Sequence, residues 1–233
     1  MTDLFGDDTP GEQIVEIRPT QRDENRATVR VGLAPGTGPK KKPRVVATLT
    51  TRIIADMGLH IGQVWTDDLA RQVEGGVGQD KAMRAAMNRL SRRAMTGWML
   101  RDKLKQLGHA SAVIDQVLER LAELDLLDDE QFGRALIRET MARKPAGPVL
   151  LKQKLFQKGI RGELADRLVA EATSDTDSQQ AAAIDFAMKR AASMMNLEHA
   201  VRERRLYGQL ARRGFDPDTI RLAMDAVERD GAE

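Results

Sequence analysis

Arginine and lysine side chains recur along this chain in blocks that could bind a polyanion. Basic and acidic segments alternate three times, with net charges of +7, −6, +7, −5, +5 and −4 over residues 81–107, 115–130, 134–161, 163–185, 189–213 and 216–233. Guanidinium groups donate paired hydrogen bonds to phosphates and carboxylates. A basic stripe with this period favours an electrostatic track for a polyanion such as DNA, or for an acidic protein groove.

Twelve basic residues are the candidates for that contact. They are Arg92, Arg93, Arg101, Lys105, Arg143, Lys144, Lys152, Lys158, Arg204, Arg205, Arg212 and Arg213. A second interpretation of the same pattern is ion pairing within the chain, between solvated helix faces. The acidic segments would then meet the neighbouring basic helices rather than a basic surface of the partner.

Residues suited to catalysis or metal binding are few. The chain has no cysteine, and His60, His109 and His199 are far apart in the sequence. The glycine-containing stretch at residues 36–40 lacks the Lys-Ser/Thr ending of a phosphate-binding loop. We therefore expect no catalytic residue, no cofactor and no metal, and a protein that is not an enzyme.

Composition predicts a mainly helical protein. Aromatic residues make up only 3% of the 233 residues, and alanine, arginine and leucine, all strong helix formers, are the commonest residues. The absence of cysteine fits a reducing compartment. No apolar run approaches the roughly 18 residues that would span a bilayer, and the acidic N-terminus is unlike a signal peptide. We expect a cytoplasmic protein with no membrane partner.

The N-terminal third has the pattern of a small α+β part. Residues 1–13 are predicted to be a disordered tail. Alternation of apolar and polar residues at 14–18 and 28–31 predicts an antiparallel hairpin, with a third strand at 44–49 and a flexible basic loop from Gly32 to Pro43 between them. A helix should follow at 50–57, and a second should begin at the cap Thr66. The glycines at 74–78 predict a break, so the α+β part is bounded at 14–78.

The rest of the chain contains an internal repeat. Residues 100–121, 151–172 and 206–227 align without gaps, with coincident leucines and with glycine at 108, 159 and 214. Each glycine is expected to end a helix in the left-handed conformation, and each copy should be preceded by a helix, at about 80–94, 129–143 and 178–195. The sequence thus predicts tandem three-helix repeats at 79–127, 128–174 and 175–233, stacked in an elongated, monomeric array. Trp98, Met99 and Tyr207 have apolar helical spacing that favours core packing, and Trp98 could alternatively stack on a base.

Three sequence motifs lie within the repeats. They are the Leu-Leu-Asp-Asp-Glu-Gln-Phe segment at 126–132, the Gly-Pro at 147–148 followed by Leu-Phe-Gln-Lys-Gly-Ile at 155–160, and the Arg-Arg-Leu-Tyr-Gly-Gln-Leu-Ala-Arg-Arg-Gly-Phe segment at 204–215. Together they resemble the RecX family of recombinase regulators, and the resemblance covers nearly the whole chain. It implies tandem three-helix repeats and a protein that binds the RecA recombinase filament on single-stranded DNA, along its helical groove, and inhibits or disassembles that filament.

A helix-turn-helix transcription regulator that reads duplex DNA is the alternative. The paired helices around each repeated glycine resemble that motif. A sequence reader needs Arg, Asn or Gln on its second helix, however, and the second helices here are acidic, which argues against groove insertion.

Overall fold

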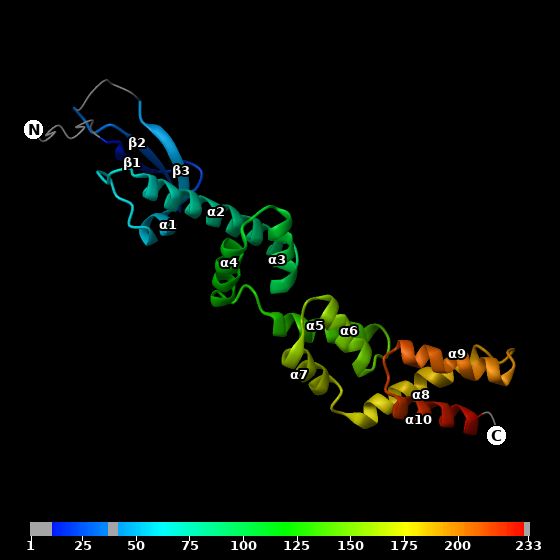
Figure 1. Cartoon of the computed structure of the whole chain (residues 1–233). Helices are drawn as coiled ribbons and strands as arrows, with labels where there is room; N and C mark the ends of the chain where they lie inside the picture. The colour runs from blue at the N-terminus through cyan, green and yellow to red at the C-terminus, as the bar shows by residue number, and fades with distance from the viewer. Residues whose placement is uncertain (1–10, 37–41, 231–233) are drawn as a thin grey trace, which may run out of the picture. The chain divides into compact units, whose positions relative to one another are not determined.

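The computed structural model describes residues 11–36 and 42–230, and within these residues a small sheet is followed by ten helices (Figure 1). The elements are β1 (Gln13–Pro19), β2 (Arg26–Gly32), β3 (Arg44–Thr50), α1 (Thr51–Asp56), α2 (Asp67–Leu90), α3 (Gly97–Gln106), α4 (Ser111–Glu123), α5 (Asp129–Arg143), α6 (Pro148–Gln157), α7 (Gly162–Ala172), α8 (Thr176–Ala192), α9 (His199–Arg212) and α10 (Pro217–Asp230). The chain divides into two compact units, residues 1–91 with 103–120 and residues 92–102 with 121–233. The mainly helical fold with a small N-terminal β part is confirmed.

The sheet of the first unit confirms the predicted hairpin and third strand. Its order is β1-β2-β3, with both neighbouring pairs antiparallel. The predicted tail is wrong at its inner end, because β1 begins at Gln13 and the Trp65 N–H donates to the Glu12 carbonyl at 2.7 Å. Residues 1–10 of that tail, and residues 37–41 of the predicted basic loop, lie outside the described residues.

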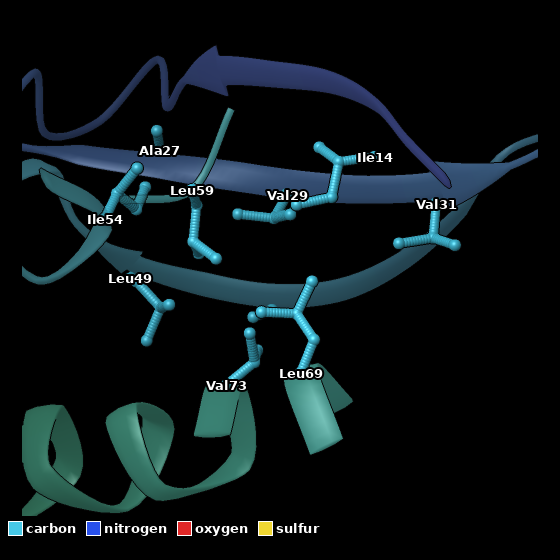
Figure 2. Close-up of a cluster of buried hydrophobic side chains, with 10 residues drawn as sticks. Ile14, Ala27, Val29, Val31, Leu49, Ile54, Leu59, Leu69 and Val73 are labelled. Carbon is cyan, nitrogen blue, oxygen red and sulfur yellow. The ribbon is translucent and has the colours of Figure 1, made fainter. Parts of the chain in front are cut away.

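One face of this sheet is covered by α2. Figure 2 shows side chains of the three strands facing Leu69 and Val73 of α2. Ile14 and Leu49 are fully buried there. The helix begins where the sequence predicts, since the Thr66 hydroxyl accepts a hydrogen bond from the Leu69 N–H at 3.2 Å.

The break predicted at residues 74–78 is wrong, because α2 runs through it as one helix. Each glycine lowers helix propensity by about 1 kcal/mol relative to alanine. Burial of Leu69 and Val73 against the sheet offsets that cost. Gly76 also permits close packing on α1, since a Cβ there would lie 3.1 Å from the side chains of both Ile53 and Met57. The boundary predicted at residue 78 therefore falls inside α2.

The second unit contains two complete three-helix groups, α5–α7 and α8–α10. The aligned leucines form their cores, since Leu151 and Leu155 of α6 and Leu206 and Leu210 of α9 are at most 1% exposed. The predicted helix at 129–143 agrees with α5. The other two predicted helices extend too far: α2 ends at Leu90 and α8 at Ala192. In both cases the next residue is a serine whose hydroxyl donates to the carbonyl three residues earlier, which competes with helix continuation.

The three repeated glycines have the predicted left-handed conformation. Their φ angles are 82° at Gly108, 84° at Gly159 and 76° at Gly214. After the first two, the N–H of the following residue, His109 or Ile160, reaches back to the carbonyl of a buried leucine, at 3.2 and 3.1 Å. This pattern is a Schellman-type helix end, which satisfies carbonyls that the helix itself leaves unpaired.

Within the second unit, the beginning of α3 packs against the turn at Gly159. The Thr96 hydroxyl donates to the Lys158 carbonyl at 2.5 Å and accepts from the Met99 N–H at 3.2 Å. A Cβ at Gly159 would lie only 2.3 Å from the Cβ of Trp98. Glycine at this turn thus allows both the left-handed conformation and the close approach of α3.

The turn at Gly214 receives the beginning of α6 in the same way. The Gly147 N–H donates to the Arg213 carbonyl at 2.8 Å, and the Val149 N–H donates to the Gly214 carbonyl at 3.1 Å. In the ungapped alignment, Gly147 corresponds to Thr96 and Arg213 to Lys158. The same contact therefore occurs twice. In each case the residues that begin the middle helix of one repeat dock on the left-handed turn of the next repeat, and we call this contact a repeat joint.

Candidate functional site

The twelve predicted basic residues are accessible. Ten are exposed, and Lys158 and Arg213 are half-buried. They lie on or beside the middle helices of the three repeats, namely α3, α6 and α9. These residues differ in whether their cationic group already forms an ion pair with an acidic side chain of the same chain.

In the second repeat, part of the charge is paired within the chain. Arg143 pairs with Glu139 at 2.6 Å, and the Lys152 ammonium lies 2.5 Å from Asp166 of α7. The Lys158 carbonyl is held in a repeat joint. The interpretation as intramolecular pairing is therefore correct for these two cations.

An ionic network also joins α5 to α7. Arg167 donates to both Glu130 oxygens, at 3.0 and 2.7 Å, and Arg134 bridges Glu130 and Glu171. Hydrogen bonds from Arg167 and then Arg134 lower the pKa of Glu130 to about 2. This network fixes helix faces within the repeat and removes these four side chains from the set that could bind a partner.

The third repeat is different, because the basic face of α9 has no such pairing. Arg204, Arg205 and Arg212 are exposed, and none of them forms an ion pair with any residue that the structure describes. Arg213 is half-buried, with its guanidinium carbon 5.7 Å from the centre of the Phe186 ring. Three cations on one helix are therefore available to an external anion.

In the first repeat, Arg92 and Arg93 lie in the link between α2 and α3, and Lys105 lies in α3. All three are exposed and are unpaired among the described side chains. Arg101 does have an interaction within the chain. The candidates thus divide into paired and unpaired cations, a distinction that the sequence pattern does not contain.

Core packing is the wrong interpretation for two aromatic residues. Trp98 is 48% exposed and Tyr207 is 51% exposed, whereas Met99 is half-buried. Phe156, which sequence reasoning missed, is 55% exposed and carries the Arg161 guanidinium over its ring at 4.1 Å. No sequence signal marked it, because the residue that follows a core leucine on a helix is buried in some cases, as at Val169, and exposed in others.

Other kinds of site find little support among residues 11–36 and 42–230. No group of three or more His, Asp or Glu side chains comes together there in a way that could hold a metal ion. In the same residues, no helix has the length and apolar character needed to cross a bilayer. His109 lies half-buried at the Gly108 turn, as the repeat alignment predicts.

Family models match each repeat separately. The models described as the first, second and third three-helix domains of RecX match residues 82–121, 128–168 and 177–224. The chain belongs to the RecX family. The three matches agree with the three helical repeats, and none of them indicates a catalytic family.

Proteins named Regulatory protein RecX are similar to this chain over most of their own length. The one from Chlorobium phaeobacteroides (strain BS1) is 36% identical over 149 residues, which cover 64% of this chain and 95% of the relative. The one from Prosthecochloris aestuarii is 37% identical over 148 residues, covering 63% and 93%. The homologues' shared name supports a regulatory role of the RecX type.

Two solved structures share the fold. A crystal structure of regulatory protein RecX has a TM-score of 0.75 at 20% identity and covers 92% of this chain and 99% of its own. RecX from Lactobacillus salivarius has a TM-score of 0.56 at 24% identity and covers 65% and 97%. At these identities the likeness concerns the arrangement of the helices.

Proposed function

We propose that this protein is a non-enzymatic, mainly negative regulator of the RecA recombinase, acting in the cytoplasm. It binds the RecA filament on single-stranded DNA and either inhibits its ATPase and strand exchange or promotes its disassembly. Family membership supports the regulatory part of this proposal. The observation that carries the binding part is the face of α9 formed by Arg204, Arg205 and Arg212, which is exposed and unpaired among the described residues.

The proposed mechanism is electrostatic docking. Exposed ion pairs within the repeats join neighbouring helices, while unpaired guanidinium groups remain free to bind phosphates of the DNA or carboxylates of the filament. Because each exposed contact is weak, several must act together, and salt must weaken them together. A helical array that presents one such face per repeat suits a filament, whose own binding sites recur along its length.

The test replaces the three α9 arginines together. We expect Arg204→Ala/Arg205→Ala/Arg212→Ala to keep its helical content by circular dichroism and to need several-fold more protein for half-inhibition of RecA ATPase. If phosphates are the partners, the slope of log affinity against log salt should fall by about 2, since each single-strand phosphate contributes about 0.7.

A matched control removes three cations that are already engaged. Lys189 pairs with Asp185, Arg221 pairs with Asp218, and Arg229 donates to the Asp225 carbonyl. Replacing all three with alanine gives the same charge change on α8 and α10 and should leave inhibition unchanged. Equal inhibition by the parent and both variants at physiological salt would contradict the assignment to α9.

The alternative, a transcription regulator that reads duplex DNA, makes a different prediction in the same assays. It requires tight binding to one duplex sequence over random duplexes and no dependence on recombinase. The RecX-type regulator should bind random single-stranded oligonucleotides coated with recombinase and nucleotide, and should show no comparable sequence preference.

A further inference from the structure

Three half-exposed aromatic side chains occur in the second unit, one on the middle helix of each repeat. Trp98 lies on α3, Phe156 on α6 and Tyr207 on α9, and each is about half exposed. The whole chain has only eight Trp, Tyr and Phe residues. A chain so poor in aromatic residues would be expected to bury them, so their regular exposure needs a reason.

A cation stands one helical turn from each of these rings. Trp98 precedes Arg101 by three residues, Lys152 precedes Phe156 by four, and Arg204 precedes Tyr207 by three. On a helix, residues at these spacings lie on the same face. All six side chains are exposed. We call these three pairs the aromatic–cation pairs.

The pairs occupy one stripe of the repeat. In the ungapped alignment, Trp98 corresponds to Arg204, and Arg101 corresponds to both Lys152 and Tyr207. The six side chains stand two residues before, one residue after or five residues after the buried leucine that begins each copy. Around the axis of a helix with 3.6 residues per turn, these three positions point in directions within about 60° of one another. The same helix face thus carries one ring and one cation in every repeat.

The repeat joints connect these helices end to end. The beginning of α6 docks on the turn after α9, and the beginning of α3 docks on the turn after α6. Trp98 therefore lies against Gly159, three residues beyond Phe156 in the chain. The pairs follow one another along connected helices rather than being scattered over the unit.

We propose that the aromatic–cation pairs are a binding track for single-stranded nucleic acid, in which Trp98, Phe156 and Tyr207 stack on bases and Arg101, Lys152 and Arg204 neutralise phosphates. The proposal rests on the proposed function and names a direct contact within it. An exposed ring offers a flat apolar face, and single strands present unstacked bases that a duplex hides. The helix α6 has no acidic residue, which favours a polyanion.

The Phe156 site already combines an aromatic ring with a guanidinium group. Arg161 covers its ring at 4.1 Å while 55% of the residue remains accessible. Proteins that bind single strands use the same elements, a ring and a guanidinium plane, to hold a base. Lys152 is engaged with Asp166 at 2.5 Å, so phosphate binding there has to compete with an exposed ion pair.

The experiment separates bases from phosphates. Binding of the full-length protein is measured to an oligothymidylate and to an abasic oligonucleotide of the same length and charge. The parent protein should prefer the oligothymidylate, and Trp98→Leu, Phe156→Leu and Tyr207→Leu should each weaken that binding by at least about fivefold, since one stacked base contributes about 1 kcal/mol or more. Binding to the abasic strand should not change.

Leucine is chosen because it keeps an apolar side chain against Gly159 at the joint while removing the ring. Met195→Ala, at a 65% exposed residue between α8 and α9, is the matched apolar control and should bind both strands like the parent. Trp98 also provides an optical signal: in a Trp65→Phe background, its fluorescence should be quenched by oligothymidylate and not by the abasic strand.

Three outcomes overturn the track. The first is equal affinity of the parent for both strands, and the second is leucine variants that bind oligothymidylate like the parent. The third is variants that bind single strands normally but no longer inhibit RecA ATPase, which would assign the rings to a protein contact and leave the proposed function intact. Failure of the parent to inhibit RecA, with base-dependent binding preserved, would instead refute the proposed function alone.

Discussion

Replacement of Gly214 by alanine should destabilise the second unit far more than replacement of Gly108 destabilises the first unit, to which Gly108 belongs. Both glycines have φ angles near +80°, so each substitution adds about 1 kcal/mol of left-handed strain. At Gly108 the new Cβ would meet nothing within 4 Å apart from the neighbouring residues of its own chain segment. At Gly214 the Cβ would lie 2.1 Å from the backbone nitrogen of Leu150, so the beginning of α6 must move away.

That movement breaks the repeat joint. The hydrogen bonds from Gly147 to the Arg213 carbonyl and from Val149 to the Gly214 carbonyl are lost, and each contributes about 1 kcal/mol. The expected loss in free energy of unfolding is therefore about 3 kcal/mol for Gly214→Ala and about 1 kcal/mol for Gly108→Ala.

Urea denaturation followed by far-ultraviolet circular dichroism measures both variants against the parent. Hydrogen exchange provides the local readout, since the Gly147 and Val149 amides should lose protection in Gly214→Ala and keep it in Gly108→Ala. Equal destabilisation by the two substitutions would refute the joint as a source of stability and leave only backbone strain.

Three further predictions follow from the structure and the sequence. Asp80→Ala should lower the free energy of unfolding, measured by urea denaturation, by about 3 kcal/mol. The Arg26 side chain is only 14% exposed and donates to both Asp80 oxygens, so the substitution leaves a nearly buried guanidinium without its carboxylate. Asp56→Ala, which removes one partner of an exposed ion pair, is the control. The pKa of Glu130 is lowered to about 2, so the stability that its charge contributes is present above the unfolded pKa and is lost as pH falls from 4.5 towards 2. Glu130→Gln should remove that part of the acid denaturation profile. Its effect at neutral pH should be small, because the site is exposed. The sequence repeat predicts an elongated, monomeric array, so small-angle scattering should give a radius of gyration above the value of about 17–18 Å expected for a globular protein of this length. A compact particle would contradict that prediction.

Local signals in the sequence were sufficient for most of the fold. Alternation predicted the first two strands, and the cap Thr66 and the ungapped repeat predicted where helices begin and where Gly108, Gly159 and Gly214 end them. The glycines at 75, 76 and 78 misled the prediction because helix propensity is a local quantity. The packing of α2 on the sheet and on α1 depends on residues distant in the sequence.

The candidate site was predictable as a set of positions but not as a set of available charges. Counting cations cannot show that Lys152 is paired with Asp166 while Arg204 forms no ion pair with a residue that the structure describes. Exposure of Tyr207 depends on which side of α9 faces α8 and α10. Phe156 and Tyr207 each directly follow a buried leucine, but that position does not decide exposure, since Val169 directly follows Leu168 and is also buried.

The direction of the repeat joints has a consequence for synthesis on the ribosome. The Thr96 hydroxyl donates to the carbonyl of a residue that is translated 62 positions later, and the Gly147 amide donates to the carbonyl of Arg213. The first and second repeats therefore leave the ribosome with these hydrogen bonds unmade, and only translation of the following repeat completes them. A nascent chain stalled before residue 213 retains an open joint, so the last repeat to be translated is the one that closes the second unit.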